Sequence, residues 1–314
     1  MTAAATRPIH LAIIGDVHDQ WTADDAHALQ GLGVDAALFV GDFGNEAVEI
    51  TRAIAALPLP KAVILGNHDS WYSATPWGRK KCPYDRSRED RVQEQLDLLG
   101  VAHVGYGCLD WPELGLSVIG GRPFSWGGPN WSYGEFYRDR FAVTGMMDSA
   151  DRIAQAAARA TQPALIFLGH NGPYGLGDQP ESICGRDWQP LGGDFGDPDL
   201  RQAIRIAQQR HQQVALVTFG HMHHHLRHRR DRLRQATASD AQGTVYVNAA
   251  VVPRIREHDR GRLHHFVWVE LLAGQVTRAA SVWVDRTGAI NAAEAWLGQP
   301  PSIQHPSTPL VPVP

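Results

Sequence analysis

Short apolar runs of strand length recur along the chain, and each stops at a glycine that is followed by Asp, Asn or His. The runs are rich in Val, Ile, Leu and Phe, a composition typical of buried strands. They occupy residues 11–18 (LAIIGDVH), 37–42 (ALFVGD), 62–69 (AVILGNHD), 164–171 (ALIFLGHN) and 214–223 (VALVTFGHMH). The pattern therefore predicts five strands that each carry a polar side chain at their carboxyl end, where the glycine is expected to permit a sharp turn.

Stretches with a helical pattern separate these runs. They cover residues 24–32, 45–56, 148–160 and 199–210, and Asp148 and Asp199 are expected to start the last two helices. Strands that alternate with helices predict an α/β fold with parallel strand pairs that are covered on both faces. Functional groups of such sheets gather beyond the carboxyl ends of the strands. We therefore expect the polar side chains to meet at one edge of one sheet.

Three later runs, at residues 244–253, 264–271 and 279–285, also have the pattern of strands. We expect them to belong to a second sheet, with a hairpin turn at Gly274-Gln275.

Composition narrows the class of protein. The 314 residues are 43% hydrophobic and 20% charged, as in an ordinary globular protein, and the net charge of -4 gives no general attraction to nucleic acid or to an anionic membrane. No apolar stretch is long enough to span a bilayer. Three cysteines without Cys-x-x-Cys spacing argue against disulfides and thiolate zinc sites. A reducing, cytoplasmic location is the expectation.

The stretch GHMHHHLRHRR, residues 220–230, is unusually rich in histidine. His221 and His223 follow the fifth strand directly, at a spacing that allows both to face the same side of a turn, so we expect both to be metal ligands. His224, His225 and His228 lie further from the strand among arginines. We expect these three to belong to a solvated, charged connection.

Taken together, the residues after the strands resemble a known family. The motifs are Asp16-x-His18, Gly41-Asp42, Gly66-Asn67-His68-Asp69, Gly169-His170 and Gly220-His221-x-His223. In order and spacing, from about residue 9 to residue 252, they resemble those of the calcineurin-like metallophosphoesterase superfamily. The resemblance implies two facing mixed β-sheets flanked by helices, a four-layer α/β/β/α sandwich, and a site for two metal ions.

The resemblance also implies a role for each motif residue. One metal would be held by Asp16, His18 and His223. The other would be held by Asn67, His170 and His221, and Asp42 would bridge the two ions. His68 would approach the substrate without binding metal, and Asp69 would orient His68.

The donor chemistry agrees with that assignment. Oxygen and imidazole donors without sulfur suit two divalent transition-metal ions, with Mn the first expectation and Fe, Zn, Co or Ni as alternatives. Two such ions lower the pKa of a bridging water and clamp both ends of an in-line displacement at phosphorus. The departing alkoxide needs a proton, and His68 is the expected donor.

The chain departs from the Ser/Thr protein phosphatase branch, because Phe43-Gly44-Asn45-Glu46 follows Gly41-Asp42 where that branch has Asp-Arg-Gly. It looks more like the bacterial phosphatases and phosphodiesterases of small molecules, and its unusual runs are similar to those of a cyanobacterial and plastid subfamily. We expect a small-molecule phosphomonoesterase. The alternatives are a phosphodiesterase that acts on a cyclic nucleotide or another diester, and a non-catalytic metal-containing scaffold.

Two long segments are expected to determine specificity within a single domain of residues 1–298. They are a lid-like insertion at about 71–147, in which Trp126 and Trp131 form either a substrate wall or surface packing, and a rim loop at 171–197. Candidate substrate contacts are Arg122, Arg186 and Trp188; a structural ion pair is the alternative for Arg186. Residues 299–314 are Pro-rich and expected to be disordered.

The expected partner is a small phosphorylated substrate. A membrane is not expected, and neither is long nucleic acid, because the one basic cluster, residues 227–234, is short and interrupted by Asp231. The sequence does not determine the oligomeric state.

Overall fold

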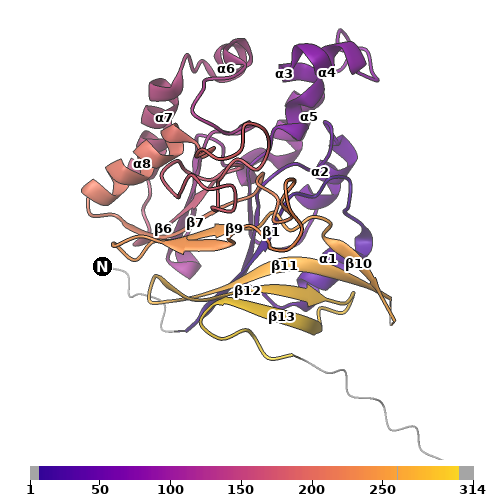
Figure 1. The fold of residues 1–314 in the computed structure, drawn as a ribbon, viewed down its shortest axis with the longest axis vertical. Helices are drawn as coiled ribbons and strands as arrows, with labels where there is room; N and C mark the ends of the chain where they lie inside the picture. Colours follow the sequence, from indigo (N-terminus) through magenta and orange to yellow (C-terminus); the bar gives the residue numbers. More distant parts are fainter. Residues whose placement is uncertain (1–6, 260, 304–314) are drawn as a thin grey trace, which may run out of the picture.

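The computed structural model describes residues 7–259 and 261–303, and two mixed β-sheets form its centre (Figure 1). The first sheet has the order β13-β12-β11-β1-β2-β3, with β10 paired to β11. Strands β1, β2 and β3 are parallel, whereas β10 to β13 are antiparallel to their neighbours. Its strands are β1 (Ile9–Ile14), β2 (Ala36–Phe39), β3 (Lys61–Val63), β10 (Ile255–His258), β11 (Gly261–Leu272), β12 (Gln275–Val284) and β13 (Ile290–Leu297).

The second sheet has the order β4-β5-β6-β7-β9-β8. Its four central strands are parallel, and the edge strands β4 and β8 are antiparallel to their neighbours. Its strands are β4 (Cys108–Trp111), β5 (Leu116–Gly120), β6 (Ala164–Leu168), β7 (Gln213–Phe219), β8 (Thr237–Ser239) and β9 (Val245–Asn248).

Helices cover the outer face of each sheet, with α7 and α8 on one side of the molecule and α2 and α5 on the other (Figure 1). The α-helices are α1 (Ala23–Gly31), α2 (Val48–Ala55), α3 (Trp71–Ala74), α4 (Pro76–Lys81), α5 (Arg91–Leu99), α6 (Gly134–Phe141), α7 (Met146–Ala158) and α8 (Pro198–Gln209). Helices α7 and α8 begin at Met146 and Pro198, so the expected starts, Asp148 and Asp199, lie inside their first turns.

Alternate side chains of each strand enter different cores, because successive side chains of a strand point to opposite faces. Leu11 and Ile13 of β1 pack between the two sheets with Ile166 of β6, while Ile14 packs under the helices of the first sheet. A third core joins β6 and β7 to α7 and α8. These layers confirm the predicted four-layer α/β/β/α sandwich.

Two expectations about the sheets are wrong. The five motif strands do not share one sheet, because β1, β2 and β3 lie in the first sheet and β6 and β7 in the second. Strands β11 and β12, expected in the second sheet, join the first through β1, and their hairpin turns at Ala273 and Gly274, which both have positive φ. Each strand was predictable locally, but its partner was not.

Residues 71–147 are not a separate lid, because they supply β4 and β5 of the second sheet and several residues of the first sheet's helical core, among them Val92 and Phe136. Of the expected disordered tail at 299–314, residues 304–314 lie outside the described residues, and the backbone carbonyls of Gln299 and Pro300 accept hydrogen bonds from Arg278. In the described part of the chain, no helix has the length and apolar character needed to cross a membrane.

Candidate metal centre and substrate cavity

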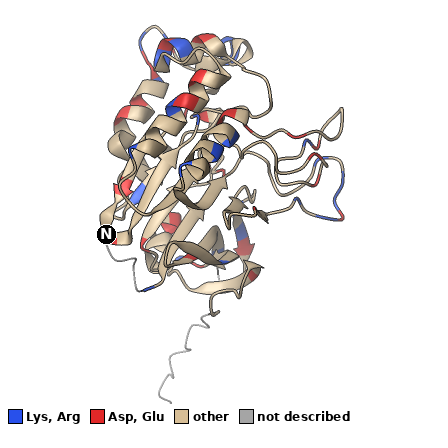
Figure 2. Ribbon diagram, turned by 90° about the vertical axis from the view of Figure 1, so that its left-hand side faces the viewer, with Lys and Arg blue, Asp and Glu red and all other residues tan. Residues whose placement is uncertain are grey.

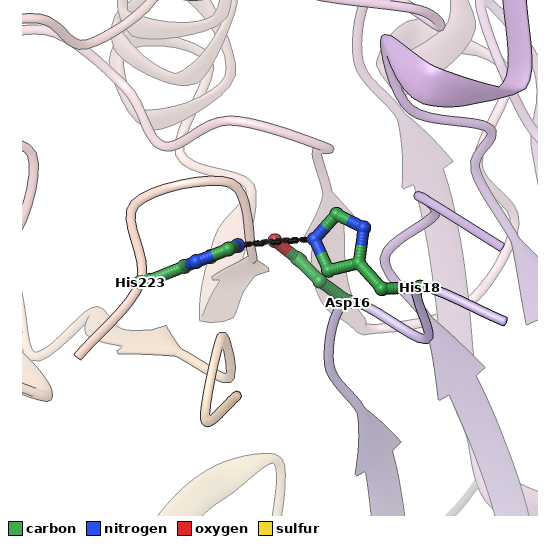
Figure 3. Close-up of side chains that lie close together, drawn as sticks. All are labelled: Asp16, His18 and His223. Atoms are coloured by element: carbon green, nitrogen blue, oxygen red, sulfur yellow. Dashed lines mark hydrogen bonds and ion pairs between the residues drawn. The ribbon is translucent and has the colours of Figure 1, made fainter. Parts of the chain in front are cut away.

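The carboxyl ends of β1 and β7 bring Asp16, His18 and His223 together (Figure 3). One ligand atom from each lies within 4.8 Å of the others. His223 Nε2 is 3.1 Å from Asp16 Oδ2 and 3.1 Å from His18 Nε2, and His18 Nε2 is 3.9 Å from Asp16 Oδ2. Three potential donors from two sheets therefore converge on one point, and they are the residues that the family resemblance assigns to the first metal.

A second group lies beside the first. The ligand atoms of Asp42, His170 and His221 also lie within 4.8 Å of one another. His170 Nε2 is 3.3 Å from Asp42 Oδ1 and 2.9 Å from the amide oxygen of Asn67. The other carboxylate oxygen of Asp42 is 3.9 Å from His18 Nε2, so Asp42 stands between the two groups. This is the position expected of a bridging carboxylate.

The backbone at this centre is strained in a way that the sequence did not indicate. His18, Asp42 and His221 have φ values of 45°, 53° and 64°, in the left-handed region that non-glycine residues rarely adopt. Such strain persists only where the surrounding structure imposes it, and it is concentrated at functional sites. Three of the candidate ligands therefore have a strained backbone that the surrounding structure holds in place.

Two glycines beside the ligands allow a carboxylate to lie close to the backbone. A Cβ at Gly66 would lie 2.3 Å from Asp42 Oδ1, and a Cβ at Gly220 would lie 2.1 Å from Asp16 Oδ1. Any side chain at either position would displace a ligand carboxylate. We had expected these glycines to permit a sharp turn, but neither has a positive φ, and the missing side chain is what the site requires.

The surrounding hydrogen bonds fit the residues for divalent metal ions. His170 Nδ1 donates to the carbonyl of Val40 at 2.7 Å, which leaves Nε2 with its lone pair directed at the centre. Burial lowers the pKa of His221 to about 3, so its imidazole is neutral. The buried carboxylate of Asp16 accepts the backbone N–H of His221 at 3.0 Å. Neutral imidazoles and carboxylates suit the transition metals named above.

His68 lies beside this centre, and its ring stacks on Trp71 with 4.8 Å between centroids and 17° between planes. Its Nδ1 is 2.7 Å from the side-chain oxygen of Asn45, an acceptor, so Nδ1 carries the hydrogen and donates it. Its Nε2 is therefore the nitrogen left to face a substrate or a metal ion, and His68 forms a third group of potential metal ligands with His18 and Asp42, whose ligand atoms lie within 4.8 Å of one another. No motif in the sequence assigned a role to Asn45, although it lies three residues after Asp42 in the same loop.

The expectation that Asp69 orients His68 is wrong. The Asp69 carboxylate is fully buried and accepts backbone N–H groups from Asp42 at 2.9 Å, Phe43 at 2.9 Å and Gly66 at 2.7 Å. The reason is local geometry, since a short 3₁₀-helix (η1, His68–Ser70) turns the side chain of Asp69 back under the loops. Asp69 thus supports the backbone that carries the ligands.

A cavity of about 370 Å³ opens above the metal centre. One side is formed by ligands, including His18 and Asn67, together with His68. The rest of the lining is largely aromatic and includes Trp71, Trp126, Trp188 and Phe195, with Trp71 stacked directly on His68. Trp126 therefore forms part of the cavity wall rather than surface packing. Trp131 packs against Tyr137 instead, with 4.8 Å between ring centroids.

The expected substrate contact Arg122 does not reach the cavity. Its side chain is 2% exposed and forms ion pairs with Asp197 at 2.9 Å and Asp199 at 3.0 Å. The strand end that carries Arg122 points it at the start of helix α8, where two carboxylates neutralise it. Arg122 therefore joins the segment after β5 to the end of the 171–197 loop.

The other two expected contacts lie differently. Arg186 donates from Nε to the carbonyl of Gly192 at 2.9 Å and is absent from the cavity lining, whereas Trp188 is part of it. Two arginines of the basic cluster at residues 227–234 also line the cavity. Arg227 lies over the Trp188 ring, 5.4 Å from its centroid, and the buried Arg234 donates to the backbone carbonyl of His223 at 3.0 Å. Their distance along the sequence from Trp188 hid this role.

Of the histidine-rich stretch, His221 and His223 lie at the candidate metal centre, and His225 also lines the cavity beside it. His225 and His228 are exposed. His224 was expected in the same solvated connection, but it is buried, and its Nε2 lies 2.9 Å from the carbonyl of Asn248. Burial lowers the pKa of His224 to about 4. Its neutral ring packs against Trp296 because alternate residues of the turn face inward.

Comparison with known proteins agrees with this geometry. The sequence matches the family model of the calcineurin-like phosphoesterases over residues 9–225. A search of curated proteins gives no significant match. One crystal structure aligns with a TM-score of 0.51 at 12% identity, over 86% of this chain and 98% of that one, a likeness of fold alone.

Similar structures include a dimetal phosphatase from Danio rerio (11% identity, TM-score 0.47, covering 93% of this chain and 99% of that one). Another is the protein TT1561 of Thermus thermophilus (12% identity, TM-score 0.47, covering 92% and 98%). Since the family model spans most of the 314 residues, the chain belongs to the calcineurin-like phosphoesterase family and is a metal-dependent phosphoric ester hydrolase.

Proposed function

We propose that the protein is a phosphomonoesterase of small molecules. The observation that carries the proposal is the lining of the cavity, in which the aromatic rings of Trp71, Trp126, Trp188 and Phe195 accompany the candidate metal ligands. With a phosphoryl group at the candidate ligands, the rest of this cavity of about 370 Å³ would hold one ester substituent beside the aromatic rings. A diester would need room for a second substituent. Both signs of charge are interspersed over the helices and loops in Figure 2, which argues against a long nucleic acid.

The residues assigned to metal binding keep the roles expected from the sequence. Asp16, His18 and His223 would hold one ion, Asn67, His170 and His221 the other, and Asp42 both. All donors are oxygen or imidazole nitrogen, which suits divalent transition metals, and manganese is the metal that we propose to test first, with Fe, Zn, Co and Ni as the alternatives. When bound, the two ions would supply a nucleophilic water of lowered pKa and a positive charge for the phosphoryl oxygens.

His68 is proposed to donate the proton that the leaving alkoxide needs. Asn45 holds Nδ1, and the stacked ring of Trp71 fixes the plane of the imidazole, so Nε2 is directed away from the packing. The positively charged Arg227 on the cavity lining supports binding of an anionic substrate. The cytoplasm remains the proposed location, because Cys82, Cys108 and Cys184 are all free thiols.

Hydrolysis of p-nitrophenyl phosphate and of bis(p-nitrophenyl) phosphate, measured with added Mn²⁺, tests the proposal. We expect the monoester to have the higher kcat/KM. His68→Ala should retain its metal content and lose about 10²–10⁴ in kcat on an alkyl phosphate, with a smaller loss on p-nitrophenyl phosphate, because nitrophenolate is a weak base that needs little protonation to leave. A higher kcat/KM for the diester would replace the proposal with phosphodiesterase activity. No turnover of either ester by the metal-loaded protein would contradict both.

A further inference from the structure

We propose that the substrate of this site is a phosphomonoester whose alcohol carries a planar aromatic ring. This inference rests on the proposed function and concerns the part of the substrate that is not hydrolysed. It follows from two aromatic walls on the cavity and from the contacts that hold them in place.

The first wall continues outward from His68. Trp71 stacks on the His68 ring, and Trp126 lies against Trp71 with 5.1 Å between centroids and 32° between planes. Tyr133 supports the far side of Trp126 at 5.1 Å. The wall therefore starts at the proposed proton donor, beside which the leaving ester oxygen and its substituent would lie.

The second wall comes from the 171–197 loop. Trp188 meets Phe195 edge to face, with 4.7 Å between centroids and 80° between planes. The guanidinium of Arg227 lies over the Trp188 ring, so this wall also carries a positive charge. All three residues line the same cavity as Trp71 and Trp126.

Buried polar contacts hold the two walls together. The backbone N–H of Gly128 donates to the carbonyl of Phe195 at 2.7 Å, and the hydroxyl of Ser125 donates to Asp197 at 2.6 Å. Arg122, which follows β5 in the segment that carries Trp126, forms an ion pair with the same Asp197. These contacts fix both loops before a ligand binds. Binding therefore has to order fewer side chains and less loop backbone, so the space beside the walls is preorganised.

The chemistry of the walls selects a flat ring. A pair of aromatic rings in contact gains more binding free energy than burial of their surface alone provides, because the ring faces and edges carry opposite partial charges. A saturated ring of similar size offers the area without this gain. The cavity of about 370 Å³ also holds the phosphoryl site, which leaves space for a ring close to the walls rather than for a long chain.

Two phosphonates that cannot be hydrolysed test the inference without any effect of the leaving group. The Kd values of 2-phenylethylphosphonate and 2-cyclohexylethylphosphonate are measured by calorimetry with the manganese-loaded protein. Parent protein should bind the phenyl compound about 2- to 13-fold more tightly, the factor that aromatic pairing adds beyond burial. Equal binding, or tighter binding of the cyclohexyl compound, would overturn the inference.

Substitutions in the two walls test which residues cause the tighter binding of the phenyl compound. Trp188→Leu should bring the ratio of the two Kd values close to one, whereas Trp188→Phe should retain most of it. Trp77→Leu is the matched control, because Trp77 is 58% exposed and touches Trp71 from outside the cavity. If Trp188→Leu does not fold, Trp126→Leu is used for the same comparison. A ratio that neither wall variant changes would overturn the inference.

The outcome is separable from that of the proposed function. If p-nitrophenyl phosphate is hydrolysed and the two phosphonates bind equally, the monoesterase proposal stands and the ring inference fails. If the phosphonates differ as expected but only the diester is hydrolysed, the ring site stands and the monoesterase proposal fails.

Discussion

Replacing Asp69 by asparagine should weaken the metal centre without changing the titration of His68. The two carboxylate oxygens of Asp69 accept three backbone N–H groups, Asp42 and Gly66 at Oδ2 and Phe43 at Oδ1. An amide has one oxygen, so its N–H₂ group would oppose at least one of these donors. A buried donor left unsatisfied costs about 1–3 kcal/mol, and each remaining bond loses about 1 kcal/mol of charge assistance.

The expected loss in free energy of unfolding for Asp69→Asn is therefore about 3–5 kcal/mol, a large part of a typical domain's stability. Urea unfolding with and without excess Mn²⁺ measures this loss, and metal analysis after dialysis measures retention of the ions. Asp139→Asn, at a side chain that is 70% exposed, is the control and should leave both quantities unchanged.

The pH dependence of kcat/KM separates support of the backbone from orientation of His68. The alkaline limb should not move in Asp69→Asn, whereas Asn45→Asp should shift it upward, because a carboxylate next to Nδ1 favours the protonated imidazole. A downward shift of that limb in Asp69→Asn with unchanged unfolding free energy would refute the reasoning.

Three further predictions follow from the structure. Asp42→Asn should lower occupancy of both metal positions from close to two ions per chain, and metal analysis that shows only one affected position would contradict bridging. His223→Ala should abolish activity, while His225→Ala should stay within several-fold of the parent. His224→Ala should lower the unfolding midpoint because the His224 side chain is buried. Equal inactivity of His223→Ala and His224→Ala would argue against the ligand assignment. Burial lowers the pKa of His265 well below its ordinary 6.5, so the unfolded chain binds this proton more readily and stability falls as the pH drops below about 6.5. His265→Gln should flatten that fall in urea titrations at several pH values, and an unchanged slope would assign the acid sensitivity to other groups.

The sequence by itself determined the features that depend on local pattern. Apolar runs that end at glycine predicted the strands β1, β2, β3, β6 and β7, and the order of residues around Asp16, Asp42 and His170 was sufficient to recognise the family and its sandwich fold. This works because a strand end and the residue after it are neighbours in the chain. The side chains that the structure gathers at the metal centre are accordingly those that the motifs singled out.

Tertiary structure alone decided what those side chains meet. Asn45, and not Asp69, contacts the ring of His68, because a single helical turn reverses the direction of Asp69. Arg122 is neutralised by Asp197, which lies 75 residues further along the chain, and Arg227 reaches Trp188 from a separate loop. Residue type and spacing carry no information about such encounters, since burial and charge pairing between distant segments are settled only when the two sheets pack face to face.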